Sequence, residues 1–351
     1  MTSSAPELRL PGRAVRLPGG VSARARPRAL ATSVLLTATV AVLAVIGVLV
    51  GGMALSPAEV WAALIGAGDQ ATGHLVWSVR LPRVLVAVLA GLALGAAGMV
   101  FQSIGRNPLA SPDVIGFTAG ASTGAVLQIL VFDAGAAAVA GGAVGGGLVT
   151  GAAVFLLAYR SGLHGQRMVI VGIGLAAMLT AVTSYLLSRA EQTDLRAAAE
   201  WLTGSLNGRT WEQVLPVAAL TVVLLPALVP LLSRLRALEL GEDSARALGV
   251  RPDLTRLLAM LAGVGLTAGA VAAAGPIPFV ALAAPQLAAR MSGGGPTALW
   301  SPALCGATLL LAADTLAQWL FPGGRLPVGV VTAAIGGLYL ATLLRWGRRV
   351  P

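Results

Sequence analysis

The sequence predicts an all-α polytopic membrane protein with about ten transmembrane helices. Its 351 residues are 56% hydrophobic and only 11% charged, whereas soluble domains carry roughly a quarter charged residues. Apolar runs recur at the length that an α-helix needs to cross a bilayer. The 45 glycines agree with this class, because small residues let transmembrane helices approach closely.

The chain divides into a short tail and one membrane domain. Residues 1–28 are polar and rich in Arg and Pro, which predicts a disordered cytoplasmic tail. Residues 29–351 are expected to form the ten-helix domain. The run Ala29–Met53 is too long for the core of a signal peptide and lacks a clear cleavage site, so we interpret it as an uncleaved first span.

Nine further spans follow from length and hydropathy. The span Pro278–Met291 is short for a helix that needs about 20 residues, and it starts in a GPIPF kink. We therefore expect it to be broken or partly buried in protein. The other expected spans are Leu81–Ile104, Val114–Phe132, Ala136–Tyr159, Met168–Ser188, Val214–Leu232, Leu254–Ala274, Leu299–Leu320 and Pro327–Leu344.

The distribution of arginine predicts the orientation in the membrane. Every basic residue is Arg, and a topology with the N-terminus inside places 18 of the 24 on the cytoplasmic side. Both termini and the loop 233–253 are then cytoplasmic. The net charge of +10 therefore marks membrane orientation, and no nucleic-acid partner is expected.

Several kinds of chemistry are excluded by residue type. Without Lys, the chain has neither a Walker A lysine for ATP hydrolysis nor a Schiff-base lysine. Cys305 stands alone, and with only His74 and His164 there is no zinc-type cluster. We expect no metal and no cofactor, and Cys305 should be a small packing residue.

The polar segment Ser233–Asp253 contains a predicted short helix, Gly241–Val250. Glu242 and Asp243 lie in its first turn, where the positive end of the helix dipole favours carboxylates. Arg246 lies toward the other end, and Gly249 suits the left-handed residue that closes a helix. Such a small helix suggests a docking element, and the alternative is an ordinary solvated loop.

Three arginines are expected at the outer ends of spans. Arg80 and Arg83 bracket Leu81-Pro82, and Arg325 precedes Leu326-Pro327. A rigid, outward-facing guanidinium suits a carboxylate on a partner protein. The alternative is interfacial anchoring by snorkelling side chains.

Two carboxylates lie in or beside predicted spans. Asp314 lies well inside Leu299–Leu320, and intramembrane charges usually face the bundle interior or water. It is either a proton-coupling residue or a structural carboxylate near a helix end, and the second interpretation is favoured because no relay partner is evident. Asp113 can cap the helix that we expect from Val114.

A weak internal similarity accompanies these features. LAGLALGAAG from Leu89 resembles LAGVGLTAGA from Leu261. The expected topology gives the two helices opposite directions, as in the inverted repeats of many transporters.

Several motifs carry a resemblance to a known family. They are RLPR at Arg80, RNPLASPDVIGFTAGASTGA at Arg106, WLTGSLNGRTW at Trp201, LGEDSARALGV at Leu240, AGPIPFVALAAPQLAAR at Ala274 and GRLPVGVVTAAIGG at Gly324. Together they resemble the FecCD family, the permeases of bacterial type II ABC importers for ferric siderophores, haem and vitamin B12. The variants SPDVIGFTAG, LTGSLNGRTW and VALAAPQ within them are most similar to the second permease subunit of ferric-enterobactin importers.

The resemblance implies partners and residue roles. Such a permease lies in the bacterial cytoplasmic membrane and pairs with a second FecCD-type permease, an ATPase dimer and an extracytoplasmic siderophore-binding protein. By resemblance, Arg80, Arg83 and Arg325 receive glutamates of the binding protein. The ATPase-coupling helix comprises Gly241, Glu242, Asp243, Arg246, Leu248 and Gly249, and the translocation path includes Thr180, Thr183 and Ser184.

The resemblance also leaves alternatives. Many relatives have Pro-His where this chain has Pro285-Gln286, so a histidine role is not carried over. The cargo is expected to be a ferric siderophore of the enterobactin type, with vitamin B12 or haem as alternatives. A proton-coupled secondary transporter is a further alternative, and Asp314 is the one residue that supports it. A membrane enzyme is another, but the sequence shows no cluster of catalytic residues for it.

Overall fold

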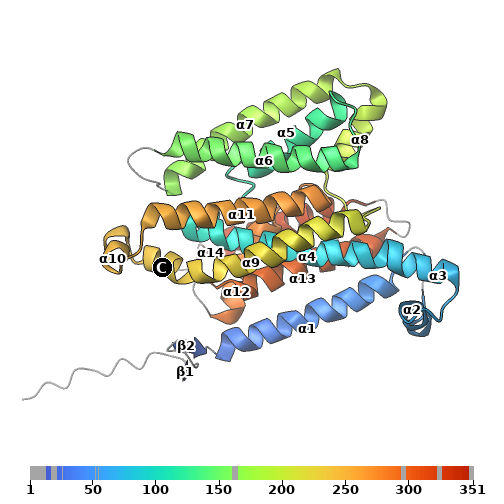
Figure 1. Ribbon diagram of the computed structural model, residues 1–351, viewed down its shortest axis with the longest axis horizontal. Helices are drawn as coiled ribbons and strands as arrows, with labels where there is room; N and C mark the ends of the chain where they lie inside the picture. Colours follow the sequence, from blue (N-terminus) through green and yellow to red (C-terminus); the bar gives the residue numbers. More distant parts are fainter. Residues whose placement is uncertain are drawn as a thin grey trace, which may run out of the picture.

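The computed structural model describes residues 13–16, 22–25, 27–51, 53, 55–159, 165–293, 298–321 and 326–347. From residue 27 onward these ranges form a helical bundle (Figure 1). The helices, including the π-helix η1, are α1 Pro27–Leu49, α2 Pro57–Leu64, α3 Gln70–His74, η1 Leu75–Arg80, α4 Leu81–Gly105, α5 Phe117–Leu130, α6 Ala136–Ala158, α7 Gly165–Arg189, α8 Gln192–Leu202, α9 Trp211–Glu239, α10 Glu242–Ala247, α11 Pro252–Ala274, α12 Val280–Ser292, α13 Trp300–Leu320 and α14 Val328–Gly347.

Each of the ten predicted spans overlaps one of these helices. In the described part of the chain, seven helical segments are long and apolar enough to cross a membrane, namely those containing α1, α4, α6, α7, α9, α11 and α13. The helix α5 and the apolar part of α14 are shorter. The helix α12 has 13 residues, in keeping with the expectation for Pro278–Met291.

The start of α5 differs from the prediction. The helix begins at Phe117, and its N-cap is Gly116, with a left-handed backbone (φ 90°). The backbone N–H of Val114 donates instead to the hydroxyl of Ser111 at 3.4 Å. The expectation that Asp113 caps a helix from Val114 is therefore wrong, because the chain is still in turns at that point.

The helices pack around α4 and α11. In the most apolar stretches of the segment containing α4 and of α11, 78% and 72% of the residues are buried. The helices α9, α11, α12 and α13 contact α4, whereas α5 and α6 lie on α11, and α1 lies on α12 and α13 (Figure 1). The two similar stretches from Leu89 and Leu261 thus lie on adjacent central helices, which run in opposite directions (Figure 1).

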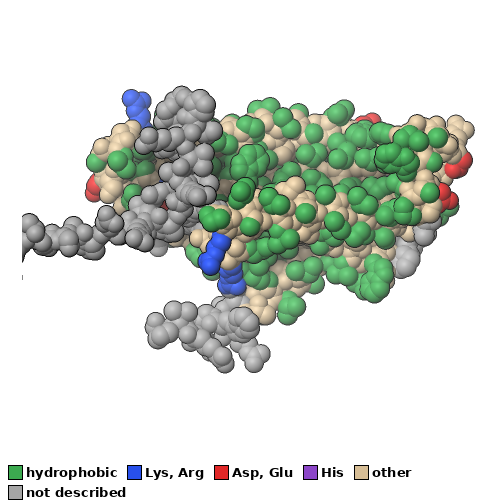
Figure 2. Space-filling view, turned by 90° about the horizontal axis from the view of Figure 1, so that it is seen from below, with side chains coloured by type: hydrophobic (Ala, Val, Ile, Leu, Met, Phe, Trp, Pro, Cys, Tyr) green, Lys and Arg blue, Asp and Glu red, His purple; other side chains and the backbone are tan. Residues whose placement is uncertain are grey.

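The outer surface of the bundle suits a bilayer. Hydrophobic side chains cover most of the face in Figure 2, and the few charged side chains lie mostly toward its two ends. Because lipid gives no hydrophobic driving force between helices, close van der Waals packing and interhelical hydrogen bonds hold such a bundle together.

A short β-hairpin departs from the expectation for the tail. Strand β1 (Arg13–Arg16) pairs antiparallel with β2 (Ser22–Ala25). The tail is thus not wholly without secondary structure.

The small helices between α1 and α4 were not predicted from the sequence. The helix α2 starts in a capping box, because the backbone N–H of Ser56 donates to the carboxylate of Glu59 at 2.7 Å and the Glu59 N–H donates to the Ser56 hydroxyl at 3.3 Å. The spacing Ser-x-x-Glu was available as a sequence signal.

Gly98 lies where α4 crosses α12 at very close range. A Cβ atom at this position would be 1.8 Å from the carbonyl oxygen of Ala281. We expect Gly98→Val to force the helices apart and to lower the free energy of unfolding by about 3 kcal/mol or more. Thermal unfolding of the detergent-purified protein measures this.

The matched control is Gly145→Val on the exposed side of α6. A Cβ atom at Gly145 has no neighbour within 4 Å, so this variant should change stability by less than about 1 kcal/mol. Equal unfolding temperatures for the two variants would show that the α4–α12 contact is not tight.

Candidate transport path and coupling site

One cavity, of about 710 Å³, lies between α5, α7 and α14. We call it the hydroxyl cavity. The three predicted path residues, Thr180, Thr183 and Ser184, all line it. The hydroxyl groups in its wall belong to Thr118, Ser122, Thr180, Thr183, Ser184 and Thr203. Neutral hydroxyls give such a cavity many weak hydrogen-bonding positions and no fixed positive charge.

Thr183 also holds α7 to the rest of the bundle. Its hydroxyl lies 2.9 Å from that of Thr123 on α5, and the Thr123 hydroxyl lies within hydrogen-bonding distance of the Leu179 carbonyl at 3.2 Å. Both threonines are buried. Because the side chain of Thr183 is already partnered, it contributes to this wall mainly through its position.

Asp113 connects the starts of two short helices beside this cavity. Its carboxylate accepts hydrogen bonds from the Thr118 hydroxyl and from the backbone of Phe279, next to the first residue of α12. Burial raises the pKa of the Asp113 carboxyl above its ordinary value, and these hydrogen bonds oppose that shift. Phe279 has a left-handed backbone, φ 68°, a conformation that costs about 1–3 kcal/mol in a non-glycine residue.

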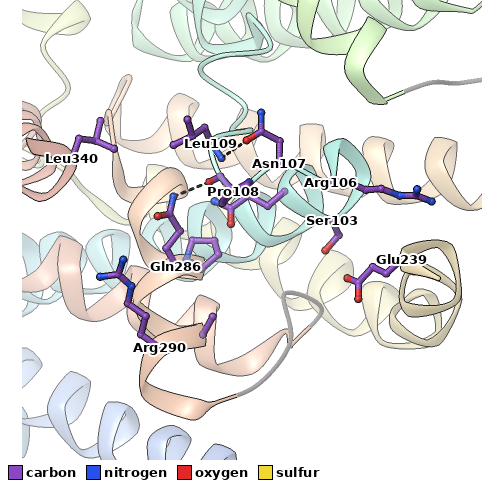
Figure 3. A pocket seen from close by; sticks show the side chains of 12 residues that line it. Ser103, Arg106, Asn107, Pro108, Leu109, Glu239, Gln286, Arg290 and Leu340 are labelled. Atoms are coloured by element: carbon purple, nitrogen blue, oxygen red, sulfur yellow. Dashed lines mark hydrogen bonds between the residues drawn. The ribbon is translucent and has the colours of Figure 1, made fainter. Parts of the chain in front are cut away.

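A second cavity, of about 770 Å³, lies between the end of α4, the turn after it, α12 and α14. We call it the arginine cavity. Figure 3 shows Gln286 and Arg290 on one side of it and Arg106, Ser103 and Glu239 on the other.

The arginine cavity is braced by side chains from separate elements. The Gln286 amide donates to the carbonyl of Pro108 at 2.7 Å, and the Tyr339 hydroxyl donates to the other end of that amide at 3.3 Å. Arg106 ends α4 with a left-handed backbone (φ 47°) and donates to the carbonyl of Leu238. Gln286 thus ties α12 to both the turn and α14, a role that needs no histidine.

The same segments line both cavities. The stretch from Arg106 to Thr118, the stretch from Pro276 to Arg290 and the helix α14 each contribute residues to both walls. The arginine cavity contains residues from the ends of α4 and α9, which lead toward α10. The two cavities therefore follow one another along one side of the bundle, with the arginine cavity nearer α10.

The predicted short helix is present as α10. Gly249 has the expected left-handed backbone (φ 77°). The N–H groups of Gly249 and Val250 donate to the carbonyls of Arg246 and Ala245, at 2.9 and 3.0 Å, which is the Schellman pattern of helix ends.

Ion pairs fix α10 on α11. Glu242 pairs with Arg256 of α11 at 2.7 Å and with Arg246 at 3.0 Å, and Asp243 pairs with Arg246 at 3.1 Å. The Arg256 side chain is only 6% exposed, so its pair with Glu242 is the strong one, whereas exposed pairs contribute little. Leu248 is 67% exposed, so it gives α10 an accessible apolar side chain.

The predicted outward-facing guanidinium groups have partners inside the protein. Arg80 is 5% exposed and donates to the carbonyls of Val48, Leu49 and Met53, at the end of α1. Arg83 pairs with Asp314 of α13 at 2.8 Å. The Arg80 guanidinium therefore does not face outward as expected, whereas the Arg83 side chain keeps 15% exposure while Asp314 engages it. Arg325 lies outside the described residues.

Asp314 has the surroundings of the structural alternative. It is 2% exposed, its two oxygens accept from the Arg83 guanidinium, and the Gln318 amide donates to it at 2.9 Å. A carboxylate held by three donor groups on two helices links α4 to α13.

The model of the FecCD transport family matches residues 38–346. This chain belongs to the FecCD transport family. It is 47% identical to the ferric enterobactin transport system permease protein FepG of Escherichia coli, over 90% of this chain and 96% of FepG. It is 34% identical to the Fe(3+)-citrate import system permease protein YfmE of Bacillus subtilis, over 93% of this chain and 98% of YfmE.

A solved structure agrees with the family. An ABC transporter of the metal-chelate type, in an inward-facing conformation, superposes with a TM-score of 0.81 at 30% identity, over 90% of this chain and 99% of that one. As a FecCD-family chain, the protein is a multi-pass transport permease and not an enzyme, and ATP hydrolysis belongs to a separate subunit.

The arginine cavity was not predicted from the sequence. Arg106 and Arg290 were counted only for orientation, and they are 184 positions apart. A signal was present, because Arg106 follows the span Leu81–Ile104 and Arg290 is the second-last residue of the span Pro278–Met291, and both lie at the cytoplasmic end in the predicted topology. That placed them at one depth, without showing that the helices bring them to one cavity.

Proposed function

We propose that this chain is one of two permease subunits of an ATP-driven importer for a ferric siderophore of the catecholate, enterobactin-like class. The observation that carries the proposal is the 47% identity to the E. coli ferric enterobactin permease, against 34% for the Fe(3+)-citrate permease YfmE at similar coverage. The importer lies in the cytoplasmic membrane, and this subunit crosses it ten times with both termini in the cytoplasm.

The cargo passes along the side of the bundle that holds the two cavities. Iron in a siderophore is already chelated, so the path needs no metal ligands of its own. Thr180 and Ser184 in the hydroxyl cavity offer weak contacts, which suit passage because tight binding hinders release. The second permease, a copy of this chain or a related one, would cover the exposed side of α7.

The partners bind at opposite ends. The ATPase dimer would grip α10 through Asp243 and Leu248, and Glu242 transmits the movement to α11 through Arg256. The binding protein would dock at the end that carries α2 and α8. Arg325 and Arg83 are the proposed contacts there, with Arg83 exchanging Asp314 for a carboxylate of the partner, while Arg80 acts indirectly by fixing the end of α1.

Uptake of radiolabelled ferric enterobactin tests the proposal. A strain that lacks this gene should lose uptake into the cytoplasm and regain it with the wild-type chain, whereas ferric citrate and ferric hydroxamates should be carried at much lower rates. Uptake should also stop when the ATPase subunit is inactivated. Unchanged uptake in the deletion strain, or uptake driven by a proton gradient without the ATPase, would overturn the proposal.

A further inference from the structure

The two cavities differ in charge. The hydroxyl cavity has one ionisable group in its described wall, Asp113, and no arginine. The arginine cavity has two, Arg106 and Arg290, together with a single carboxylate, Glu239. Among the described residues that line the two cavities, arginine therefore appears only at the arginine cavity, on the side of α10.

The two arginines are held in place without using up their donors. The guanidinium carbon of Arg290 lies 5.8 Å from the centre of the Tyr339 ring, a cation–π geometry that orients the group. Arg106 uses one nitrogen to reach the Leu238 carbonyl, and a guanidinium has five N–H donors. Both arginines are exposed residues and both line the cavity.

The space between them suits a bulky ligand. Figure 3 shows Gln286 and Pro108 between the two arginines, which lie on opposite sides of the cavity. Its volume of about 770 Å³ lies within the range of roughly 300–1,000 Å³ for small-molecule sites. The amides of Gln102, Asn107 and Gln286 add neutral hydrogen-bonding groups to the wall.

A catecholate iron chelate matches this lining. The charge of its deprotonated oxygens exceeds that of iron(III), so the complex is an anion. Guanidinium groups bind oxygen anions through paired N–H groups and also stack on aromatic rings. Arg106 and Arg290 can therefore contact both the iron-bound oxygens and the catechol rings of such a chelate.

We propose that the arginine cavity is an exit subsite, at which Arg106 and Arg290 bind the anionic iron chelate after it leaves the hydroxyl cavity. The inference rests on the proposed function, and it adds a reason for the chelate to move from the hydroxyl cavity toward the arginine cavity. Of the two described cavity walls, only the one nearer α10 attracts the chelate through arginine. Because both guanidinium groups are exposed to water, that attraction is screened and the chelate is still released.

Arg290→Gln tests the subsite with little risk to the fold, since Arg290 is exposed and makes no ion pair among the described residues. The assembled permease–ATPase complex in lipid nanodiscs is titrated with ferric enterobactin, without the binding protein. We expect the Kd to rise about tenfold, as for loss of one charge-assisted hydrogen bond, and to become less sensitive to salt. Arg290→Lys should restore part of the affinity.

The matched control is Arg167→Gln at the start of α7, which lines neither cavity. It should bind ferric enterobactin like the wild type, and Arg290→Gln should bind a neutral ferric hydroxamate like the wild type. If Arg290→Gln binds and carries ferric enterobactin normally, the exit subsite is wrong and the proposed function stands. If the wild-type complex neither binds nor carries it, the proposed function itself falls.

Discussion

Replacement of Glu242 by Lys is expected to reduce ferric siderophore uptake to background while the permease remains folded. The Glu242 carboxylate lies 2.7 Å from Arg256 and 3.0 Å from Arg246. A lysine there would place a third positive charge beside two guanidinium groups, and α10 would lose its attachment to α11. Uptake normalised to the amount of folded permease, together with ATP hydrolysis by the assembled complex, measures the loss of coupling.

Glu212→Lys is the matched control for this change. Glu212 also lies in the first turn of its helix, α9, so both substitutions carry the same unfavourable interaction with the helix dipole, about 0.3–1 kcal/mol. Glu212 makes no ion pair within the described residues. Normal uptake by Glu242→Lys would show that α10 does not transmit the ATPase movement through Arg256.

Asp314→Ala is expected to destabilise the permease by about 3–5 kcal/mol, because removal of one partner leaves the other charge of a buried pair uncompensated. The pair with Arg83 is short, at 2.8 Å, and the two side chains are 2% and 15% exposed. Thermal unfolding in detergent measures the effect. Asp314→Asn should lose less, since the amide oxygen still accepts a hydrogen bond from Arg83.

The double variant Arg83→Gln/Asp314→Asn separates pairing from proton transfer. If the two residues act only on each other, it should be more stable than the sum of the single changes predicts. Uptake per folded molecule should show no new pH dependence in Asp314→Asn. Strictly additive losses, or a pH-dependent transport defect, would contradict the structural role.

Much of the helical framework could be predicted from the sequence, because length and hydropathy in a bilayer leave few options for the backbone. All ten predicted spans overlap a helix, and Gly249 closes α10 as its residue type suggested. The prediction failed where a helix starts inside the protein. Polar residues before Phe117 looked like a cap at Asp113, but the turn continues through Gly116.

The site was harder to predict, since it depends on contacts between distant parts of the chain. Arg83 and Asp314 are 231 positions apart, and each alone suggests a different role. From the sequence, Asp314 was placed well inside one span and Arg83 at the mouth of another, and neither was given a partner within the chain. Their pairing depends on how α13 packs against α4. The bond between Gln286 and Pro108 likewise depends on how α12 leans on a turn, and no local pattern carries that information.

The loose attachment of α7 determines where the bundle can change shape at low cost. Only 11% of the residues in its most apolar stretch are buried, and the hydrogen bond between Thr123 and Thr183 is a polar link to α5. A small rotation of α7 would break the hydrogen bond between Thr123 and Thr183, while the interior around α4 keeps its packing. We therefore expect the hydroxyl cavity at Thr180 and Ser184 to widen or narrow when this one helix rolls, with the rest of the subunit acting as a fixed wall.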